Sequence, residues 1–451
     1  MAAASDKARF YLEQSVPELQ EYQRKKIFGK DEIIAITKKR SDFEHKLNGR
    51  GSRPSDYARY AEYEMNLESL RRKRVKRLGI KATTHAGQRR IFFILDRATR
   101  KFHGDVGLWM QYIEFARKEK ANKKLSQILT SVLRMHPTKP ELWIYAAKYA
   151  IESTADMTAA RSYMQRGLRF CKSSKLLWLE YAKLEMIYIA KISARRQILG
   201  LDEKRPRSND KTVLDDPNAD LIALPAITAE DVDPSLRGDD ELDQAALQNL
   251  STAPALTGAI PLAIFDAGMK HFEMSDELGD NFFDMFTQFE GLPCLSTILQ
   301  HVVDCLLMNT PESPLSLGCF IRQPVIGIEA KSPEFPSALG KSIERLRLSL
   351  RKAKPKLRLV EGVAAWIAGL SSIEGLDPAI QKVLFVTLRQ AVRNIEEVDV
   401  EDQRVELGHF TLLLRTLHEA GMKDDAQIVQ QMGRNRWGFE ERIQGAVDHN
   451  G

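Results

Sequence analysis

The sequence predicts an all-α fold, an α-solenoid of stacked helical hairpins, from the spacing of three tryptophans and the similarity of the phrases around them. Trp109, Trp143 and Trp178 lie 34 and then 35 residues apart, in LWMQYIEFARKE, LWIYAAKYAIE and LWLEYAKLEM. Self-similarity at this period is typical of repeats built from two helices. Such units bury their apolar faces only by stacking, so the chain can grow to 451 residues along one axis without one large compact core.

Each phrase places its large side chains on one side of a helix. Counted from each Trp, offsets of 0, +3 and +6 or +7 share a helical face. A first helix is expected upstream of each Trp, near residues 91–100, 125–135 and 160–170, with His136-Pro137 ending the second of them. The unit is therefore helix, short turn, helix.

The same stripe appears upstream without tryptophan, at Tyr57, Tyr60 and Tyr63. Ser55 is expected as the N-cap and Gly79 as the end of this helix. The helix carries the basic segment RRKRVKRL. Residues 5–47 before it predict amphipathic helices that are interrupted near Pro17 and Gly29.

The composition changes near Gly200. Residues 202–250 hold 13 acidic and 5 basic residues without sustained periodicity, which predicts a disordered acidic insertion. Helical patterning returns with IPLAIFDAGMKHF and with Phe283, Phe286 and Phe289. Further helices are expected at 295–308, 338–352, 356–370, 377–396, 402–420 and 423–436, with a flexible loop at 309–337.

Four regions follow from these patterns: a helical region with a basic helix (1–80), hairpin repeats (81–200), the acidic insertion (201–255) and C-terminal helical repeats (256–451). The residues expected to pack between repeats are Tyr57, Tyr60, Trp109, Tyr112, Phe115, Trp143, Tyr149, Trp178, Tyr181, Phe283, Phe286 and Phe289.

Three glutamates, Glu64, Glu185 and Glu290, lie at offset +7 on the apolar face. An unpaired carboxylate there would be costly. We expect each to accept hydrogen bonds from the adjacent helix. A catalytic role is disfavoured because equivalent residues recur in several repeats.

The phrase Trp-x-x-Tyr-x-x-aromatic at a period near 34 resembles the HAT repeat, the half-a-tetratricopeptide module of RNA-processing complexes. The phrases VPELQEYQRKKIFGKDEIIAITKKRSDFEHKL and DYARYAEYEMNLESLRRKRVKRLG resemble the opening of the U3 small nucleolar RNA-associated protein 6 family. The resemblance covers about residues 10–200 and, less closely, 256–295. Departures are Ala146 at the +3 Tyr position, Phe283 in place of Trp, and Ala116 and Ala150 in place of Glu.

This resemblance implies a non-enzymatic scaffold of the nucleus and nucleolus, a subunit of the UTP-B subcomplex of the small-subunit processome. It implies a need for the chain in early pre-rRNA processing, 18S rRNA maturation and 40S ribosome biogenesis. The implied partners are UTP-B subunits, including WD-propeller proteins, with U3 snoRNA and pre-rRNA nearby.

No catalytic apparatus, cofactor site or metal site is expected. The nine histidines and four cysteines show no ligand spacing, and neither GxxxxGK[ST] nor GxSxG occurs. Gly49-x-Gly51 indicates a turn, and His409 and His418 indicate solvated or core positions. The few cysteines suggest a reducing compartment, and no membrane segment, membrane partner or small-molecule substrate is predicted.

Two basic segments, 71–81 and 341–358, are the candidate sites for RNA-backbone contact or, for the first, nucleolar targeting. A solvated helix face is the simpler interpretation, but each neutralised phosphate releases counterions. Base stacking is not indicated because few aromatics are interleaved with the cations. The candidates are Arg71, Arg72, Lys73, Arg74, Lys76, Arg77, Arg345, Arg347, Arg351, Lys352 and Lys354. Reversal of Arg71, Arg72 and Arg74 to Glu is expected to leave the fold intact.

Two other functions share this scaffold. One is a HAT-repeat protein of messenger-RNA splicing or 3′-end formation, against which the N-terminal phrases argue. The other is a protein prenyltransferase-like α-subunit, which also stacks helical hairpins. The acidic insertion and the basic helix do not suit that enzyme subunit.

Overall fold

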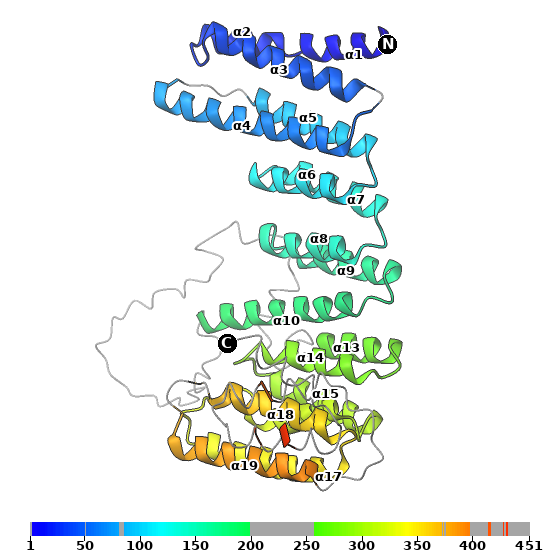
Figure 1. Cartoon of the computed structure of the whole chain (residues 1–451), viewed down its shortest axis with the longest axis vertical. Helices are drawn as coiled ribbons and strands as arrows, with labels where there is room; N and C mark the ends of the chain where they lie inside the picture. Colours follow the sequence, from blue (N-terminus) through cyan, green and yellow to red (C-terminus); the bar gives the residue numbers. More distant parts are fainter. Residues whose placement is uncertain are drawn as a thin grey trace, which may run out of the picture. The chain divides into compact units, whose positions relative to one another are not determined.

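The computed structural model describes residues 2–49, 51–80, 85–198, 257–371, 373 and 376–396, with 414, 415, 427, 430 and 431. Every regular element in these ranges is a helix (Figure 1), which confirms the all-α prediction. The chain divides into two compact units, Met1–Lys172 and Ser173–Gly451. Each unit is described by itself, and the four sequence regions stay a prediction.

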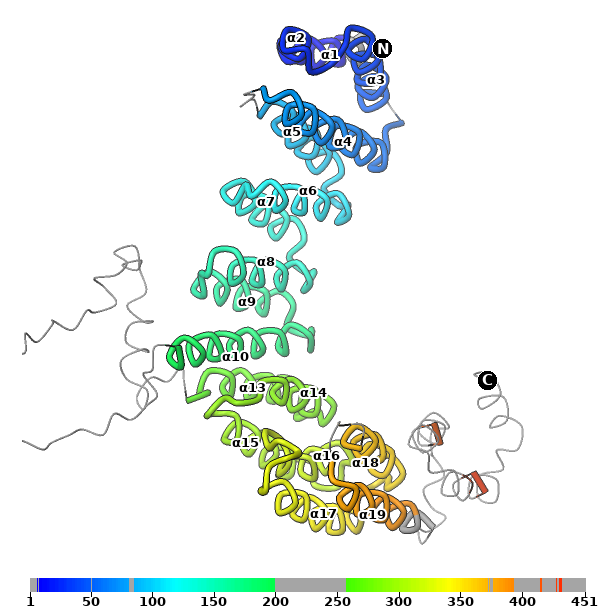
Figure 2. The backbone as a smooth tube through the Cα atoms, turned by 90° about the vertical axis from the view of Figure 1, so that its left-hand side faces the viewer, coloured from blue at the N-terminus to red at the C-terminus, as the bar shows by residue number. Residues whose placement is uncertain are grey.

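The N-terminal unit is a succession of paired helices. In Figures 1 and 2, α4 lies beside α5, α6 beside α7 and α8 beside α9, each pair following the last along the chain. The bounds are α1 Ala2–Glu13, α2 Val16–Arg24, α3 Lys30–Asn48, α4 Pro54–Leu78, α5 Ala86–Lys101, α6 Val106–Lys118, α7 Asn122–Met135, α8 Pro140–Ser153 and α9 Met157–Phe170.

The ends of α4 follow from its proline and glycine. Arg53, not Ser55, is the N-cap, and its N–H donates to the Asp56 carboxylate at 3.0 Å. The prediction for Ser55 was wrong because Pro54, whose fixed φ suits the first helical position, starts the helix two residues earlier than a Ser55 cap would. Gly79 ends the helix as predicted, with a φ of 63° in the left-handed region that favours glycine.

The indoles of the N-terminal unit donate to backbone carbonyls in the turn before their own helix. Trp109 Nε1 donates to His103 O and Trp143 Nε1 to Pro137 O, both at 2.9 Å. The same carbonyls meet the following repeat: His136 Nε2 lies 2.7 Å from His103 O, and Cys171 Sγ donates to Pro137 O at 3.3 Å. One carbonyl oxygen in each turn therefore contacts both the tryptophan of the helix that follows the turn and a side chain of the next repeat.

Seven of the residues expected to pack between repeats lie in this unit. Trp143 is 5% exposed, and the Phe170 ring stacks on it at 6.0 Å between centroids. Phe92 meets Phe115 edge-on at 4.8 Å. All seven are buried: Tyr57, Tyr60, Trp109, Tyr112, Phe115, Trp143 and Tyr149.

The C-terminal unit continues with helices of less regular length. They are α10 Lys175–Ile198, α13 Ala259–His271, α14 Asp276–Thr287, α15 Leu295–Asn309, α16 Pro314–Arg322, the 3-10 turn η2 Gln323–Val325, α17 Phe335–Lys352, α18 Lys356–Ser371 and α19 Pro378–Glu396. Four of them match the helices expected at 295–308, 338–352, 356–370 and 377–396. The helices expected at 402–420 and 423–436, the acidic insertion, and His409 and His418 fall outside the described residues, apart from isolated positions.

Aromatic packing in this unit is uneven. Trp178 is half-buried and stacks on His271 at 6.1 Å, while Tyr181, Phe283 and Phe286 are buried. Phe289 is half-buried because α14 ends at Thr287, before the stripe is complete.

The prediction of a flexible loop at 309–337 was wrong. Pro314 occupies the first turn of α16, where a missing N–H costs nothing, and Ser316 and Leu317 are buried. Gln323–Val325 adds a 3-10 turn. The proline, serine and glycine that suggested a loop are compatible with this helix start and its buried face.

We expect Trp143→Ala to destabilise the N-terminal unit by about 3–5 kcal/mol, because it removes a buried indole and leaves a cavity between hairpins. Native-state hydrogen exchange of the amides of α7, α8 and α9 measures this change locally. Trp143→Phe is the matched control: it keeps an aromatic ring but loses the N–H, and should cost only about 1–2 kcal/mol. Unchanged protection in Trp143→Ala would show that the indole does not join the hairpins.

Candidate nucleic-acid interface

The basic segment of α4 contains cations of two kinds, and its three ion-paired arginines are the first kind. Arg71 is buried and pairs in a fork with Glu68, at 2.7 Å for both nitrogen–oxygen contacts. Arg72 reaches Glu68 at 2.9 Å and Glu119 at 2.7 Å. Arg74 holds Glu32 at 2.6 and 2.7 Å.

These pairs attach α4 to its neighbours. Glu32 lies on α3 and Glu119 directly follows α6, so Arg74 and Arg72 bridge from α4 in two directions. Arg74 and the Gly29 N–H bond the Glu32 carboxylate and lower its pKa to about 2. Replacement of Arg71, Arg72 and Arg74 by Glu would remove these pairs and set like charges against Glu68, Glu119 and Glu32, so the contacts favour a destabilised fold over the intact fold expected from the sequence.

The second kind of cation is exposed. Lys73, Lys76 and Arg77 occupy the last two turns of α4 with exposed side chains. Positive charge there complements the partial negative charge of the helix C-terminus. These three side chains can also meet phosphate without breaking a pair that holds helices together. Lys81, the end of the predicted segment, is outside the described residues.

The other basic segment, in the C-terminal unit, is divided in the same way. Arg345 donates to Phe320 O and Gln323 Oε1, both at 2.8 Å, and stacks over the Phe320 ring at 4.2 Å. Burial lowers the pKa of this guanidinium. Lys354 pairs with Glu312 at 3.2 Å in solvent, and Arg347, Arg351 and Lys352 are exposed on α17. The two segments belong to different units.

A buried charge network lies beneath the first basic segment. Arg40 of α3 forks onto Glu64 of α4 at 2.7 and 2.8 Å, and its side chain is 1% exposed. Glu18 of α2 lies 3.7 Å from Arg40, accepts from Arg90 of α5 at 2.8 Å, and accepts from the Tyr22 hydroxyl at 2.6 Å. Four helices thus share one set of paired charges.

The network favours the charged form of the Glu18 carboxylate. Burial alone would raise the pKa of Glu18, but the guanidinium groups of Arg40 and Arg90 and the Tyr22 hydroxyl outweigh it, and the pKa is lowered. Burial and the same Glu18 carboxylate raise the pKa of Tyr22 well above its ordinary value. Burial opposes the charge of Arg40, yet Glu64 and Glu18 raise its pKa. The folded state therefore favours the charged forms of Glu18 and Arg40.

The prediction for Glu64, a carboxylate bonded from the adjacent helix, is confirmed. Glu185 is buried in α10. The prediction for Glu290 was wrong. Glu290 lies beyond the end of α14 and is exposed, so its offset of +7 does not place it on the apolar face of a helix.

Gly87 of α5 sets how closely α5 approaches this region. A Cβ at Gly87 would overlap the Glu68 carboxylate that holds Arg71 and Arg72. A side chain at this position would therefore require the Glu68 carboxylate to move away from Arg71 and Arg72. The sequence analysis missed Gly87, Arg40, Glu18 and Arg90, because no local pattern connects positions that far apart.

Among the residues that the structure covers, no cluster of His, Cys, Asp or Glu could hold a metal ion. Within those same residues, no helix combines the length and apolarity needed to cross a bilayer.

The fold and this interface define a helical-repeat protein. Its N-terminal unit has exposed cations at the end of α4, and buried ion pairs join α2, α3, α4 and α5. The family model for U3 small nucleolar RNA-associated protein 6 matches residues 12–94, the stretch that contains Glu18, Arg40, Glu64, Glu68, Gly87 and Arg90. This N-terminal stretch of the chain is therefore similar to that family.

Curated relatives agree with this family over part of their length. The U3 small nucleolar RNA-associated protein 6 of Schizosaccharomyces pombe is 39% identical over 236 residues, which cover 50% of this chain and 48% of the relative. The Homo sapiens homolog is 33% identical over 190 residues, covering 41% and 32%. The Dictyostelium discoideum homolog is 27% identical over 210 residues, covering 46% and 34%. The matched part of this chain thus spans less than half the length of each relative.

Removal of one partner from the buried pair should destabilise the N-terminal unit strongly. Arg40→Met leaves the buried Glu64 carboxyl group without its guanidinium partner, and we expect a loss of about 3–5 kcal/mol. Arg40→Met with Glu64→Leu should recover part of that loss in urea unfolding. Arg9→Met is the control, since the Arg9–Glu13 pair is 81% and 61% exposed and should contribute about 0–1 kcal/mol. Equal losses in Arg9→Met and Arg40→Met would contradict the network.

Glu18 should make stability depend on pH in acid. Its pKa is lowered from 4.5 in the folded state, so its contribution is present above pH 4.5 and is lost as the pH falls through the folded pKa. The stability difference between the wild type and Glu18→Gln should therefore shrink steadily below that pH. Urea midpoints of both proteins from pH 3 to 7 measure it, and a constant difference would rule out this linkage.

Proposed function

We propose that this chain is a non-enzymatic scaffold subunit of the small-subunit processome, within UTP-B, needed for early pre-rRNA processing and 18S rRNA maturation in the nucleolus. The observation that carries the proposal is the family match over residues 12–94. The names of the relatives place them with U3 small nucleolar RNA. The finer terms, UTP-B and HAT repeat, rest on the resemblance of the N-terminal phrases and the tryptophan period.

Protein partners are the main ligands in this proposal. Paired helices offer extended surfaces on which peptide segments and propeller edges can bind. The WD-propeller subunits of UTP-B are the partners proposed for them. The supporting feature is a rigid N-terminal frame, in which ion pairs fix α2, α3, α4 and α5 to one another.

RNA contact is the second part of the proposal, and it is assigned to backbone phosphates of U3 snoRNA or pre-rRNA. The exposed cations are Lys73, Lys76 and Arg77 in one unit and Arg347, Arg351 and Lys352 in the other. The segment RRKRVKRL carries no aromatic residue on which a base could stack. Such contacts add affinity without reading sequence.

Affinity purification of the tagged full chain tests the assignment. Recovery of U3 snoRNA together with propeller subunits supports it. Recovery of splicing or polyadenylation factors without U3 snoRNA would reject it and would leave the helical fold unaffected.

We expect Lys73→Glu, Lys76→Glu and Arg77→Glu together to weaken retention of U3 snoRNA while the fold stays intact. Each lost phosphate contact should lower the slope of log affinity against log salt concentration by about 1. Circular dichroism checks the fold, and salt elution of the captured complex measures retention.

The matched control is Lys38→Glu, Lys39→Glu and Lys118→Glu, which changes the net charge equally at exposed positions of the same unit. Equal losses of RNA in both triple variants would indicate a general charge effect. Loss in neither would show that the end of α4 is a solvated helix face.

A further inference from the structure

The C-terminal unit contains a cavity beside α17 whose lining includes two cations. Its volume is about 540 Å³, within the range of roughly 300–1,000 Å³ of ligand pockets in proteins. One side of the lining is a face of α17 with Ser337, Lys341 and Arg345. The other side comes from the segment before α17 and contains Gln323, Pro324, Ile328 and Pro333.

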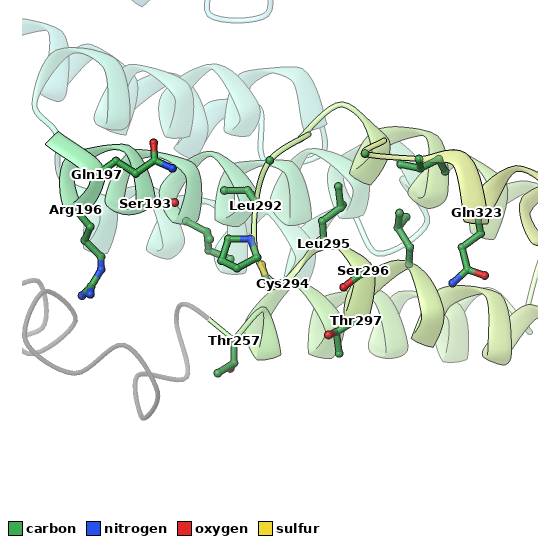
Figure 3. Close-up of a pocket in the computed structure, with 16 residues that line it drawn as sticks. Ser193, Arg196, Gln197, Thr257, Leu292, Cys294, Leu295, Ser296, Thr297 and Gln323 are labelled. Atoms are coloured by element: carbon green, nitrogen blue, oxygen red, sulfur yellow. The ribbon is translucent and has the colours of Figure 1, made fainter. Parts of the chain in front are cut away.

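A larger cavity of the same unit, drawn in Figure 3, is less suited to a charged ligand. Its volume is about 1100 Å³, and it lies between the end of α10 and the first turn of α15. Arg196 is the only cation among the described residues that line it, and this side chain is 4% exposed and already interacts with another group. Gln323, labelled in Figure 3, lines both cavities. The cations available to a ligand therefore belong to the smaller cavity.

Neutral groups hold Arg345 in place. Its Nη1 donates to Phe320 O and Gln323 Oε1, both at 2.8 Å, and its Cζ lies 4.2 Å from the centroid of the Phe320 ring. Gln323 donates in turn to Gln300 Oε1 at 2.7 Å, and Gln300 donates to Asp304 at 2.8 Å. This chain of hydrogen bonds reaches a carboxylate only after two amides. The guanidinium is therefore fixed in position without a carboxylate in direct contact.

The other N–H groups of Arg345 are available to a ligand. Within the part of the chain that the structure describes, Nε and Nη2 make no hydrogen bond or ion pair, and neither atom is buried. Burial of the side chain lowers the pKa of the guanidinium, and Asp304 opposes this only in part. A bound carboxylate would offset this cost and would accept from Nε and Nη2 together, in a fork.

Lys341 supplies a second cation at a defined distance. It lies one turn before Arg345 on the same face of α17, about 6 Å along the helix axis. Lys341 is exposed and pairs with no acid among the described residues. In an extended peptide, residues i and i+2 point to the same side and lie about 6.4–6.8 Å apart. Two carboxylates at that spacing therefore match the two cations.

Glu334 is the acid of the lining, and it lies away from this pair of cations. It precedes Lys341 by seven residues, about 10 Å along the helix axis, and is the N-cap of α17. A carboxylate at that end complements the partial positive charge of the helix N-terminus. It therefore does not neutralise the cations one and two turns further along.

The second side of the cavity distinguishes a peptide from a nucleic acid. In an extended peptide the residue between the two carboxylates points away from them, toward the apolar side with Pro324, Ile328 and Pro333. An RNA backbone would use the cations and leave this side unfilled. No aromatic residue lines the cavity in the described segment, so a base has no ring on which to stack.

From the unpaired cations, their spacing and the apolar side, we propose that this cavity binds an acidic segment of a partner protein in which one apolar residue lies between two carboxylates. Arg345 holds one carboxylate in a fork, Lys341 attracts the other, and the apolar residue packs on Pro324 and Ile328. This site goes beyond the proposed function, and it is present whichever complex the protein joins.

Labelled peptides and the purified full chain test the proposal by fluorescence anisotropy. The peptide GSGDLDGSG should bind about tenfold more tightly than GSGNLNGSG, which lacks the carboxylates. It should bind about fivefold more tightly than GSGDSDGSG, which lacks the apolar side chain. Equal binding of the three peptides, or binding of none of them, would overturn the proposal.

Variants of α17 locate the binding. Lys341→Gln removes a cation that makes no contact within the described fold, and it should weaken binding of GSGDLDGSG about fivefold. Arg345→Lys keeps the charge but loses the fork, and should weaken binding about tenfold. Arg347→Gln is the matched control, because Arg347 is exposed on α17 and does not line the cavity. It should bind the peptide as the wild type does, and circular dichroism checks the fold of all three variants.

Two results of this series would contradict the site. One is equal affinity of Lys341→Gln and Arg347→Gln for GSGDLDGSG, which would show a general effect of charge. The other is binding of a labelled uridine oligonucleotide that Lys341→Gln and Arg345→Lys weaken, with no preference among the three peptides. The cavity would then bind backbone phosphate and not an acidic protein segment.

Discussion

A backbone carbonyl in the turn between two helices is the atom on which the N-terminal unit depends. Pro137 O accepts from the indole of Trp143 in its own repeat and from the thiol of Cys171 after the next helix. His103 O meets Trp109 and His136 in the same way. Each of these two indoles therefore contributes an N–H donor as well as apolar bulk. The period of 34 residues between Trp109 and Trp143 is also the period of this hydrogen-bonded contact.

Toward the N-terminus, ion pairs take over the role of the indoles. Tyr57 and Tyr60 occupy the positions of the aromatic stripe, but Arg40, Glu64, Glu18 and Arg90 make the contacts that cross between helices. A buried ion pair adds little net stability compared with apolar packing, whereas an unmatched partner is costly. Such a network penalises every other arrangement of α2, α3, α4 and α5. It therefore specifies one arrangement of these four helices.

The helices and helix ends that could be predicted are those determined by residues close to them in the sequence. Aromatic stripes located α4, α6 and α8, and Gly79 marked the end of α4 because a left-handed φ suits glycine. The carboxylate of Glu64 was predictable from its place on an apolar face, although its partner was not, since Arg40 lies on another helix. The stripe ending at Glu290 and the loop expected at 309–337 failed for one reason. Each depended on where a helix starts or stops, and Pro314 and Thr287 determine that through backbone geometry that composition does not reveal.

In the basic segment of α4, too, the sequence alone did not predict which cations are paired and which are exposed. In the sequence its six cations are equivalent, yet the structure separates them by the acids that reach them. Arg71 and Arg72 face Glu68 one turn earlier on the same helix, which the sequence does show, whereas Glu119 and Glu32 arrive from distant positions. Lys73, Lys76 and Arg77 project into solvent, so a phosphate that binds them does not compete with a carboxylate that holds the fold. One helix can therefore serve as a structural joint along one face and as an electrostatic surface along another, because its angular period assigns successive cations to different neighbours.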